Sequence, residues 1–271
     1  MRLHVVFSSE EPVTLPWHYP SLLQGYLYRA IAKARPDLGS LLHDRGLTAE
    51  GHRYKMMVFS RLFPRQASPA SNGLSMTPPI HWWVSSPLLA PMQALVEALM
   101  SENQAILGAA NLDVASVEVE PTPDLSGFVW CETISPLVAS TAVRDGEKLQ
   151  KRYLSPYDAA FWQVLAANLQ RKAAAFGLPV QPASTVRFKP GHEWRSRLLQ
   201  VQGTQVRGYE GRFAIEGDPQ LLLLAYEAGL GERNSQGFGM FRVLSRRRQA
   251  QSGGCPVEER TSHGMPGYSC L

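Results

Sequence analysis

The sequence predicts an α+β fold of two tandem ferredoxin-like units, each with the element order βαββαβ that also defines RRM-like domains. Two observations lead to this prediction. The same order of elements occurs twice along the chain, and its 271 residues provide length for both copies, since one such unit needs roughly 80 to 110 residues. We expect one domain at residues 1–122, a second at 125–245, and a flexible tail at 246–271, which is rich in Gly, Ser and polar residues.

The first unit shows apolar periodicity of alternating strand and helix type. It should contain a strand, a helix, two strands, a helix and a strand at residues 2–8, 22–34, 55–63, 80–85, 89–102 and 114–120. The segment PRQASPASNGLSMTPP between the two middle strands is rich in Pro, Ser and Gly, so an irregular loop is expected there.

The second unit begins after the proline-flanked stretch at 121–124, which resembles a linker. A hairpin should turn at Arg144-Asp145-Gly146. The remaining elements should be a strand, a helix, three strands, a helix and a strand at residues 127–134, 156–176, 184–189, 194–202, 205–215, 219–228 and 238–244.

Composition places the chain among ordinary globular proteins, with 44% hydrophobic and 18% charged residues. No apolar run approaches the ~18 residues that cross a bilayer, and Met1 leads directly into a strand, so a cytoplasmic protein without membrane association is expected. The three cysteines have neither metal-ligand spacing nor an even disulfide pattern, and no cluster of Asp and Glu offers a Mg²⁺ site. We therefore predict no metal and no cofactor.

A glycine-rich segment, AGLGERNSQGFGMFRV, lies between the last helix and the last strand. Glycines permit positive φ and close approach of a ligand to the backbone, and polar side chains between them supply hydrogen-bond donors, a combination that suits a sugar-phosphate chain. The alternative is a helix C-cap followed by a loose turn. The residues concerned are Gly229, Gly231, Gly237 and Gly239, with Arg233, Asn234 and Ser235.

A basic stripe occupies residues 187–212, where six cationic side chains face only Glu193 and Glu210. Its net charge of +4 equals the excess of the whole chain, as expected for a surface that binds a polyanion. The alternative is a solvated face of a hairpin. Trp194 within the stripe either stacks on a base or belongs to the core. The cations are Arg187, Lys189, Arg195, Arg197, Arg207 and Arg212.

The string GLGERNSQGFGM resembles the C-terminal glycine-rich loop of the repeat-associated RNA-binding proteins of CRISPR systems, most closely that of the Cas-six type endoribonucleases. The segments RLHVVF, LLQGYLYRAI, LLHDRG, TISPL and FKPG match the same family in the same order, over residues 1 to about 245. The resemblance implies a CRISPR repeat RNA as partner. Other subunits of a CRISPR effector complex and a second copy of the chain are further possible partners.

The resemblance also implies a catalytic trio of Tyr28, His43 and Lys55. A helical wheel turns Tyr28 away from the presumed core, although a ring packed on a neighbouring loop is the alternative. His43 falls near the end of a short helix, where the helix dipole favours imidazolium. Lys55 opens the next strand, either as the catalytic cation or as a solvated edge charge, and Arg53 is close enough to replace it.

The implied activity is cleavage of precursor CRISPR RNA within its repeats, without metal. A 2′-hydroxyl attacks the adjacent phosphorus, leaving a 2′,3′-cyclic phosphate and a 5′-hydroxyl. By resemblance Tyr28 accepts the proton, His43 donates to the leaving oxygen and Lys55 stabilises the transition state. A reference pKa near ~10 makes tyrosine a poor base, so His43 is the alternative base.

Binding should involve both domains. The residues expected to contact RNA are Arg187, Lys189, Arg195, Arg197, Gly231, Arg233, Asn234, Ser235, Gly237 and Gly239. The alternative function is that of a non-catalytic RNA-binding subunit of a CRISPR effector complex, which would use the same fold and loop.

Overall fold

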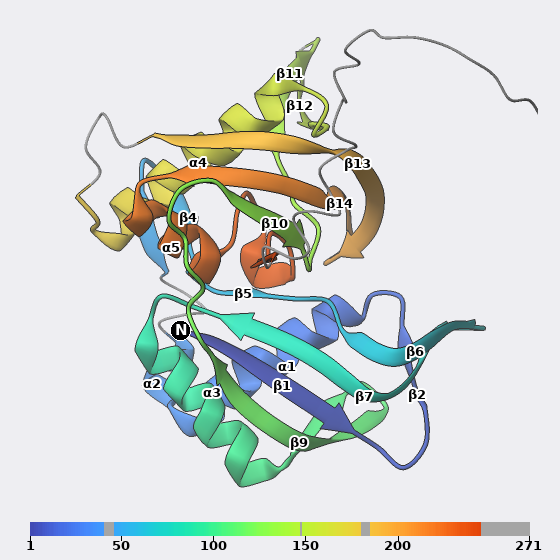
Figure 1. Ribbon diagram of the computed structural model, residues 1–271. Coiled ribbons are helices and arrows are strands. Elements are labelled where there is room, and N and C mark those ends of the chain that lie inside the picture. The colour runs from blue at the N-terminus through green and yellow to red at the C-terminus, as the bar shows by residue number, and fades with distance from the viewer. Residues whose placement is uncertain (41–45, 147, 180–184, 245–271) are drawn as a thin grey trace, which may run out of the picture.

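The structure is a computed structural model that describes residues 1–40, 46–146, 148–179 and 185–244. His43 and the segment 246–271 lie outside the described residues. Figure 1 shows two sheets, one above the other, with helices on each.

The N-terminal half forms a seven-stranded sheet in the order β2-β7-β1-β9-β8, with β5 and β6 also pairing with β7. A separate hairpin joins β3 to β4. The strands are β1 (Arg2–Ser8), β2 (Val13–Pro16), β3 (Leu47–Ala49), β4 (His52–Tyr54), β5 (Val58–Phe59), β6 (Phe63–Ala70), β7 (Gly73–Ser85), β8 (Gln104–Leu107) and β9 (Ala110–Glu120). The helices are α1 (Tyr19–Ala34), α2 (Pro36–Ser40) and α3 (Leu89–Glu102).

The C-terminal half forms a four-stranded sheet in the order β13-β14-β10-β15, and a separate hairpin joins β11 to β12. The strands are β10 (Val129–Thr133), β11 (Ser140–Asp145), β12 (Lys148–Tyr153), β13 (Val186–Val201), β14 (Thr204–Gly217) and β15 (Phe241–Val243). The helices are α4 (Ala159–Phe176), α5 (Pro219–Ala228) and the 3₁₀ turn η2 (Asn234–Gln236).

Both halves have the βαββαβ order of a ferredoxin-like unit, which confirms the predicted fold class. Strand alternation places Leu3, Val5 and Phe7 of β1 in the core beneath the helices. On α1, Leu23, Leu27 and Ile31 recur at four-residue spacing and are fully buried on that face. Among the residues that the structure describes, no helix covers the opposite face of this sheet (Figure 1).

The prediction of an irregular loop at PRQASPASNGLSMTPP is wrong, because most of this segment belongs to the long β6–β7 hairpin. Composition misled here because the prolines occupy positions where the ladder tolerates them. The register shifts between Pro64 and Gln66, opposite Pro78 and Pro79, and such irregularities accommodate residues without an N–H donor.

Two other strand predictions need correction. The predicted strand at 55–63 shrinks to Val58–Phe59, so Lys55 lies between β4 and β5 and does not open a strand. The predicted strands at 184–189 and 194–202 are one strand, β13, with an irregular register between Pro190 and Trp194. Strands β2 and β8 and the β3–β4 hairpin have no counterpart among the predicted elements.

The two halves are joined by buried contacts. The Arg2 side chain is 2% exposed and donates to the carbonyls of Phe241 at 2.9 Å and Tyr226 at 2.5 Å. Tyr54 and Met56, from the N-terminal half, pack in the hydrophobic core of the C-terminal half. We propose a domain boundary at residues 122–125, between the last strand of one sheet and the first strand of the other.

Candidate functional site

The glycine-rich loop runs from the end of α5 to β15 and packs tightly against the rest of the protein. Gly229, Gly231, Gly237 and Gly239 all have positive φ, between 69° and 87°. A side chain at Gly237 would come within 2.7 Å of Phe59, on β5 of the N-terminal half. The close approach that these glycines permit is therefore to the protein itself, and Gly229 also caps α5 as the alternative interpretation holds.

Lys172 of α4 fixes the shape of this loop through three hydrogen bonds. Its ammonium donates to the carbonyls of Gly229 at 2.7 Å and Gly231 at 3.0 Å, and to Oδ1 of Asn234 at 2.6 Å. Lys172 is 3% exposed. Burial lowers its pKa to about 7, against the raising effect of the Glu232 carboxylate.

Asn234 is committed to the loop. Its amide nitrogen donates to the carbonyls of Leu230 and Phe238, at 2.9 and 3.0 Å, while Oδ1 accepts from Lys172. The Asn234 side chain was predicted as a donor to RNA. Both its amide nitrogen and its amide oxygen instead form hydrogen bonds within the protein that hold the shape of the loop.

Glu232 ties the loop to the β11–β12 hairpin. Its carboxylate accepts from the backbone and hydroxyl of Ser140, at 2.8 and 2.6 Å, and pairs with Lys151 at 2.6 Å. The outer side of the loop is thereby fixed to a second element of the C-terminal half.

Tyr28 meets the loop from the N-terminal half. It is half-buried at the edge of the first core, and its hydroxyl lies near the Ser235 side chain. The predicted orientation away from the core is therefore wrong, and the alternative, a ring packed on a neighbouring loop, is observed. Burial raises the pKa of Tyr28, and the neighbouring Ser235 side chain opposes that rise.

Lys55 lies over the Tyr28 ring, with its ammonium 5.0 Å from the ring centroid. Three predicted site residues from two domains, Tyr28, Lys55 and Ser235, therefore come together. The structure does not describe His43, the remaining member of the predicted catalytic trio. Gly46, three residues further on, lies beside the backbone of Tyr54 and the side chain of Arg53.

A cavity of about 350 Å³ opens in front of this cluster. Both candidate cations, Arg53 and Lys55, line it from the N-terminal half, and Arg233, Ser235 and Gln236 line it from the loop. Arg233 donates to Gln236 at 2.8 Å. The cavity is thus rich in donors and cationic groups, the surroundings that a phosphate prefers.

The predicted basic stripe lies on β13 and β14, and Arg187, Lys189, Arg195 and Arg197 are all exposed. Part of its charge is paired. Arg187 forms an ion pair with Glu216 at 2.8 Å, and Arg197 with Glu210 at 2.9 Å. Trp194 packs among core aromatics, with its ring 5.6 Å from that of Trp162 and 6.5 Å from that of Phe213, so its core interpretation is the observed one.

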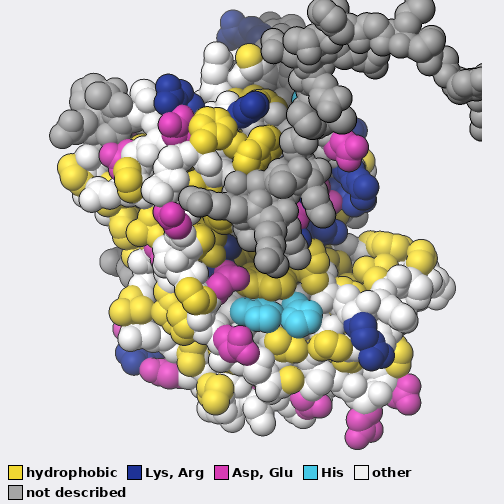
Figure 2. All heavy atoms as spheres, viewed as in Figure 1, with side chains coloured by type: hydrophobic (Ala, Val, Ile, Leu, Met, Phe, Trp, Pro, Cys, Tyr) yellow, Lys and Arg dark blue, Asp and Glu magenta, His cyan; other side chains and the backbone are white. Residues whose placement is uncertain are grey.

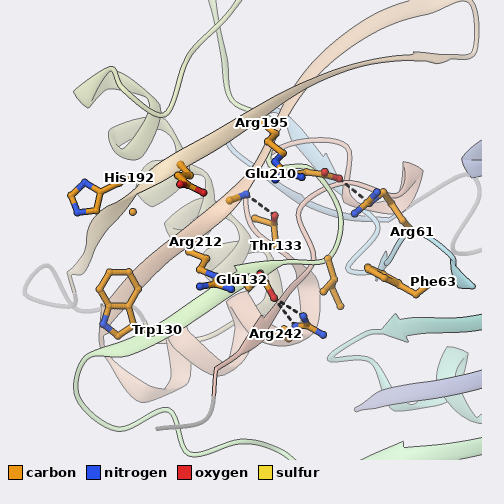
Figure 3. A pocket seen from close by; sticks show the side chains of 14 residues that line it. Arg61, Phe63, Trp130, Glu132, Thr133, His192, Arg195, Glu210, Arg212 and Arg242 are labelled. Carbon is orange, nitrogen blue, oxygen red and sulfur yellow. Dashed lines mark hydrogen bonds and ion pairs between the residues drawn. The ribbon is translucent and has the colours of Figure 1, made fainter. Parts of the chain in front are cut away.

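A second, larger cavity of about 550 Å³ lies beside the stripe (Figure 3). In it Glu132 accepts from Arg212 and Arg242, and Glu210 pairs with Arg61, of the N-terminal half, at 2.8 Å. Each carboxylate therefore holds two arginines in place, since Glu210 also binds Arg197.

Sequence reasoning missed Lys172, Glu232 and Arg61. Lys172 sits at a buried position of an apolar helix face, beside Leu165, Leu169 and Ala173, and that placement is the one local signal for it. Arg61 follows a two-residue strand and gives no such signal.

Within the described ranges, no helix is both long and apolar enough to span a bilayer. In the same ranges, no three His, Cys, Asp or Glu side chains gather in a way that would hold a metal ion.

The arrangement of two ferredoxin-like units is shared with a solved structure described as an RAMP protein binding different RNA substrates, which superposes with a TM-score of 0.77 at 22% identity, over 90% of this chain and 100% of the other. Residues 120–243 match the family model described as CRISPR associated protein Cas6, C-terminal. This part of the chain is therefore similar to the Cas6 family.

Similarity to Cas6 proteins extends over nearly the whole chain. It is 25% identical to CRISPR-associated endoribonuclease Cas6 1 of Methanocaldococcus jannaschii, covering 89% of this chain and 91% of that protein. It is 26% identical to CRISPR-associated endoribonuclease Cas6 of Pyrococcus furiosus, covering 84% of this chain and 83% of that protein. A solved structure described as CRISPR associated protein Cas6 superposes with a TM-score of 0.76 at 24% identity, over 90% of this chain and 99% of the other.

Proposed function

We propose that this protein is a metal-independent endoribonuclease that cleaves precursor CRISPR RNA within its repeats. The observation that supports this most directly is the meeting of Tyr28 and Lys55 with Ser235 of the glycine-rich loop, beside a cavity lined by cationic groups. The Cas6 relatives named as endoribonucleases support the same activity.

The reaction is an intramolecular transesterification at phosphorus. The 2′-hydroxyl loses its proton to a base, its oxygen bonds to the adjacent phosphorus, and the bond from phosphorus to the 5′-oxygen breaks. The leaving oxygen then takes a proton from an acid, which gives a 2′,3′-cyclic phosphate and a 5′-hydroxyl. Holding attacker and leaving group in line supplies much of the rate, because flexible RNA lacks that geometry.

The roles follow from charge and pKa. Burial raises the pKa of Tyr28, so at neutral pH it is a phenol that orients the nucleophile better than it accepts a proton. We assign the neutral-pH proton exchange to His43, on the resemblance alone. Lys55, with Arg53 as the alternative, stabilises the charge that develops on the phosphorane.

Binding is assigned to both domains. The exposed cations of β13 contact the phosphates and fix the register of the RNA, while the loop presents Arg233 and Ser235 toward the cutting cavity. Gly231, Gly237 and Gly239 act by letting the loop pack closely, and Asn234 by holding its shape.

Variants of the trio test the proposal in EDTA with a synthetic repeat RNA. His43→Ala should abolish cleavage and leave binding intact, and Tyr28→Phe should slow cleavage while retaining the pH profile near neutrality. Trp17→Phe, at an exposed position outside the cavity, is the control. Undiminished cutting by His43→Ala would overturn the assignment. A series of repeats with one 2′-deoxy nucleotide at each position identifies the cut site, since a single position should be protected.

The second candidate is a non-catalytic RNA-binding subunit. The names of two further relatives support this candidate. These relatives are 24% and 23% identical to the chain, and they are called putative CRISPR-associated endoribonuclease-like proteins Cas6 and Cas6nc. Purified protein that binds a repeat but never cuts one would support this candidate. Partner subunits and a homodimer remain predictions, which the mass of the particle in solution tests.

A further inference from the structure

The face of the N-terminal sheet that lies away from α1 and α3 carries a cluster of aromatic rings. Its strands alternate strictly there: Trp82 of β7 is fully buried, whereas its neighbours His81 and Trp83 are half-buried on the opposite face. His4 of β1 lies directly across from Trp83 in the ladder. Figure 2 shows histidine side chains side by side on this face, next to hydrophobic ones.

The rings are arranged as a stack. The planes of His4 and Trp83 lie 9° apart with centroids at 4.6 Å, and those of His4 and His81 lie 13° apart at 5.1 Å. The imidazoles also share a hydrogen bond of 2.9 Å between Nε2 of His4 and Nδ1 of His81. Burial and the neighbouring His81 lower the pKa of His4, against the raising effect of Glu118 and Glu120. The imidazole thus stays neutral and stacks as a neutral ring at physiological pH.

The ring cluster extends to the arginine-lined cavity through an edge-on contact. Phe63 of β6 meets Trp83 edge-on at 5.6 Å, and the Arg61 guanidinium lies 5.4 Å from the Phe63 ring. Both Phe63 and Arg61 line the 550 Å³ cavity, together with Arg195, Arg212 and Arg242 (Figure 3). Flat rings and cations therefore adjoin on one continuous surface.

Aromatic rings beside cationic side chains are typical of protein surfaces that bind single-stranded RNA. Bases stack on exposed rings while neighbouring cations hold the phosphates, and RNA-binding sheets of the βαββαβ type place such aromatics on their central strands. β1 and β7 are central strands of this sheet. Trp82 packs in the core beneath the helices. Trp83 and Phe63, on the opposite face, also pack against the small buried cluster of Val58, Ile134 and Met240.

We propose that His4, His81 and Trp83 form a stacking platform for an unpaired base of an RNA ligand, whose flanking phosphates contact the arginines of the adjoining cavity. The platform is separate from the cutting cavity, because Tyr28 lies on α1, on the other face of the sheet. The inference deepens the proposed function by assigning a second RNA contact, made by nucleotides away from the scissile bond.

A short homopolymeric uridine RNA with one internal 2-aminopurine tests the platform independently of any repeat sequence. Wild-type protein should bind it and quench the fluorescence of the probe, which reports stacking. The double substitution His4→Ala with His81→Ala should weaken binding about 10- to 100-fold and restore the fluorescence, the range expected when stacking rings are removed. Trp83→Leu should act in the same direction.

Trp17→Ala removes an equally large ring at a 58% exposed position between β2 and α1, which does not line the arginine-lined cavity, and should change neither quantity. Circular dichroism and thermal unfolding show whether each variant is folded. If Trp83→Leu does not fold, the double histidine variant, at half-buried positions, still tests the platform. Unchanged affinity and quenching in a folded double variant would overturn the platform.

Cleavage of a repeat RNA separates this inference from the proposed function. The double variant should need a higher RNA concentration to reach half of its maximal cleavage rate, because its loss is in binding. A wild-type protein that stacks the probe but cuts no repeat would refute the nuclease and leave the platform standing.

Discussion

Lys172 is the residue on which the shape of the glycine-rich loop most depends. A buried ammonium with three acceptors is stable only because the carbonyls of Gly229 and Gly231 and the oxygen of Asn234 replace its hydration shell. These acceptors lie 57 to 62 residues away along the chain. No local pattern reveals such a contact, which is why the sequence did not predict it.

The depressed pKa of Lys172 has a definite effect on stability. Its folded pKa is about 7 and its ordinary value is 10.5. Between these values the unfolded chain binds a proton that the folded chain has released, so the contribution of Lys172 to the free energy of unfolding increases with pH there. Below pH 7 both states are protonated and the full cost of burial remains.

Urea unfolding at pH 6.5 and 9 measures this effect. Wild type should gain stability over that interval relative to Lys172→Met, which lacks the titrating group. Lys189→Met removes an exposed lysine and should follow wild type. Parallel pH dependence of wild type and Lys172→Met would show that Lys172 does not titrate in this range.

Among the elements, α5 and the β6–β7 hairpin mark the limits of sequence-based prediction. α5 was predicted at 219–228 and observed at Pro219–Ala228, because its signals are local: the Asp218 side chain caps it, a proline opens it and Gly229 ends it. The hairpin depends on pairing with distant strands, which overrides the composition of its segment.

The candidate site divides in the same way. The glycines and polar residues of the loop stand out in the sequence, but their meeting with Tyr28 and Lys55 depends on contacts between the two domains. The packing of Gly237 on Phe59 joins segments from the two domains, and no spacing along the chain predicts it.

A pair of glycine substitutions tests the packing of the loop. Gly237→Ala strains a φ of 86° and also places a methyl group 2.7 Å from Phe59. Gly203→Ala strains a φ of 77° with nothing within 4 Å. We expect Gly203→Ala to cost about 1 kcal/mol, and Gly237→Ala about 1 to 3 kcal/mol more.

Thermal unfolding supplies the stability comparison, and cleavage of a repeat RNA supplies the second readout. Only Gly237→Ala should slow cleavage, because only it displaces the loop that carries Ser235. Equal losses of stability and rate in both variants would show that backbone strain alone matters.

At the scale of the whole molecule, the buried Arg2 contacts hold the two sheets together and so fix how far the stacking platform lies from the cutting cavity. An RNA that reaches both gains affinity through effective concentration, because its second contact is intramolecular. Shorter RNAs reach only one.

Affinity should therefore rise stepwise with RNA length, and the step should vanish in the double variant His4→Ala with His81→Ala. Arg195→Gln removes an exposed cation from the arginine-lined cavity. For long RNAs it should make the fall of log affinity with log salt less steep by about 0.7, the value expected for one lost phosphate contact on a single strand. Lys33→Gln, on α1 and paired with Glu102, should leave that slope unchanged. A smooth rise of affinity with each added nucleotide would contradict two fixed contacts, because a uniform electrostatic surface adds the same increment at every length.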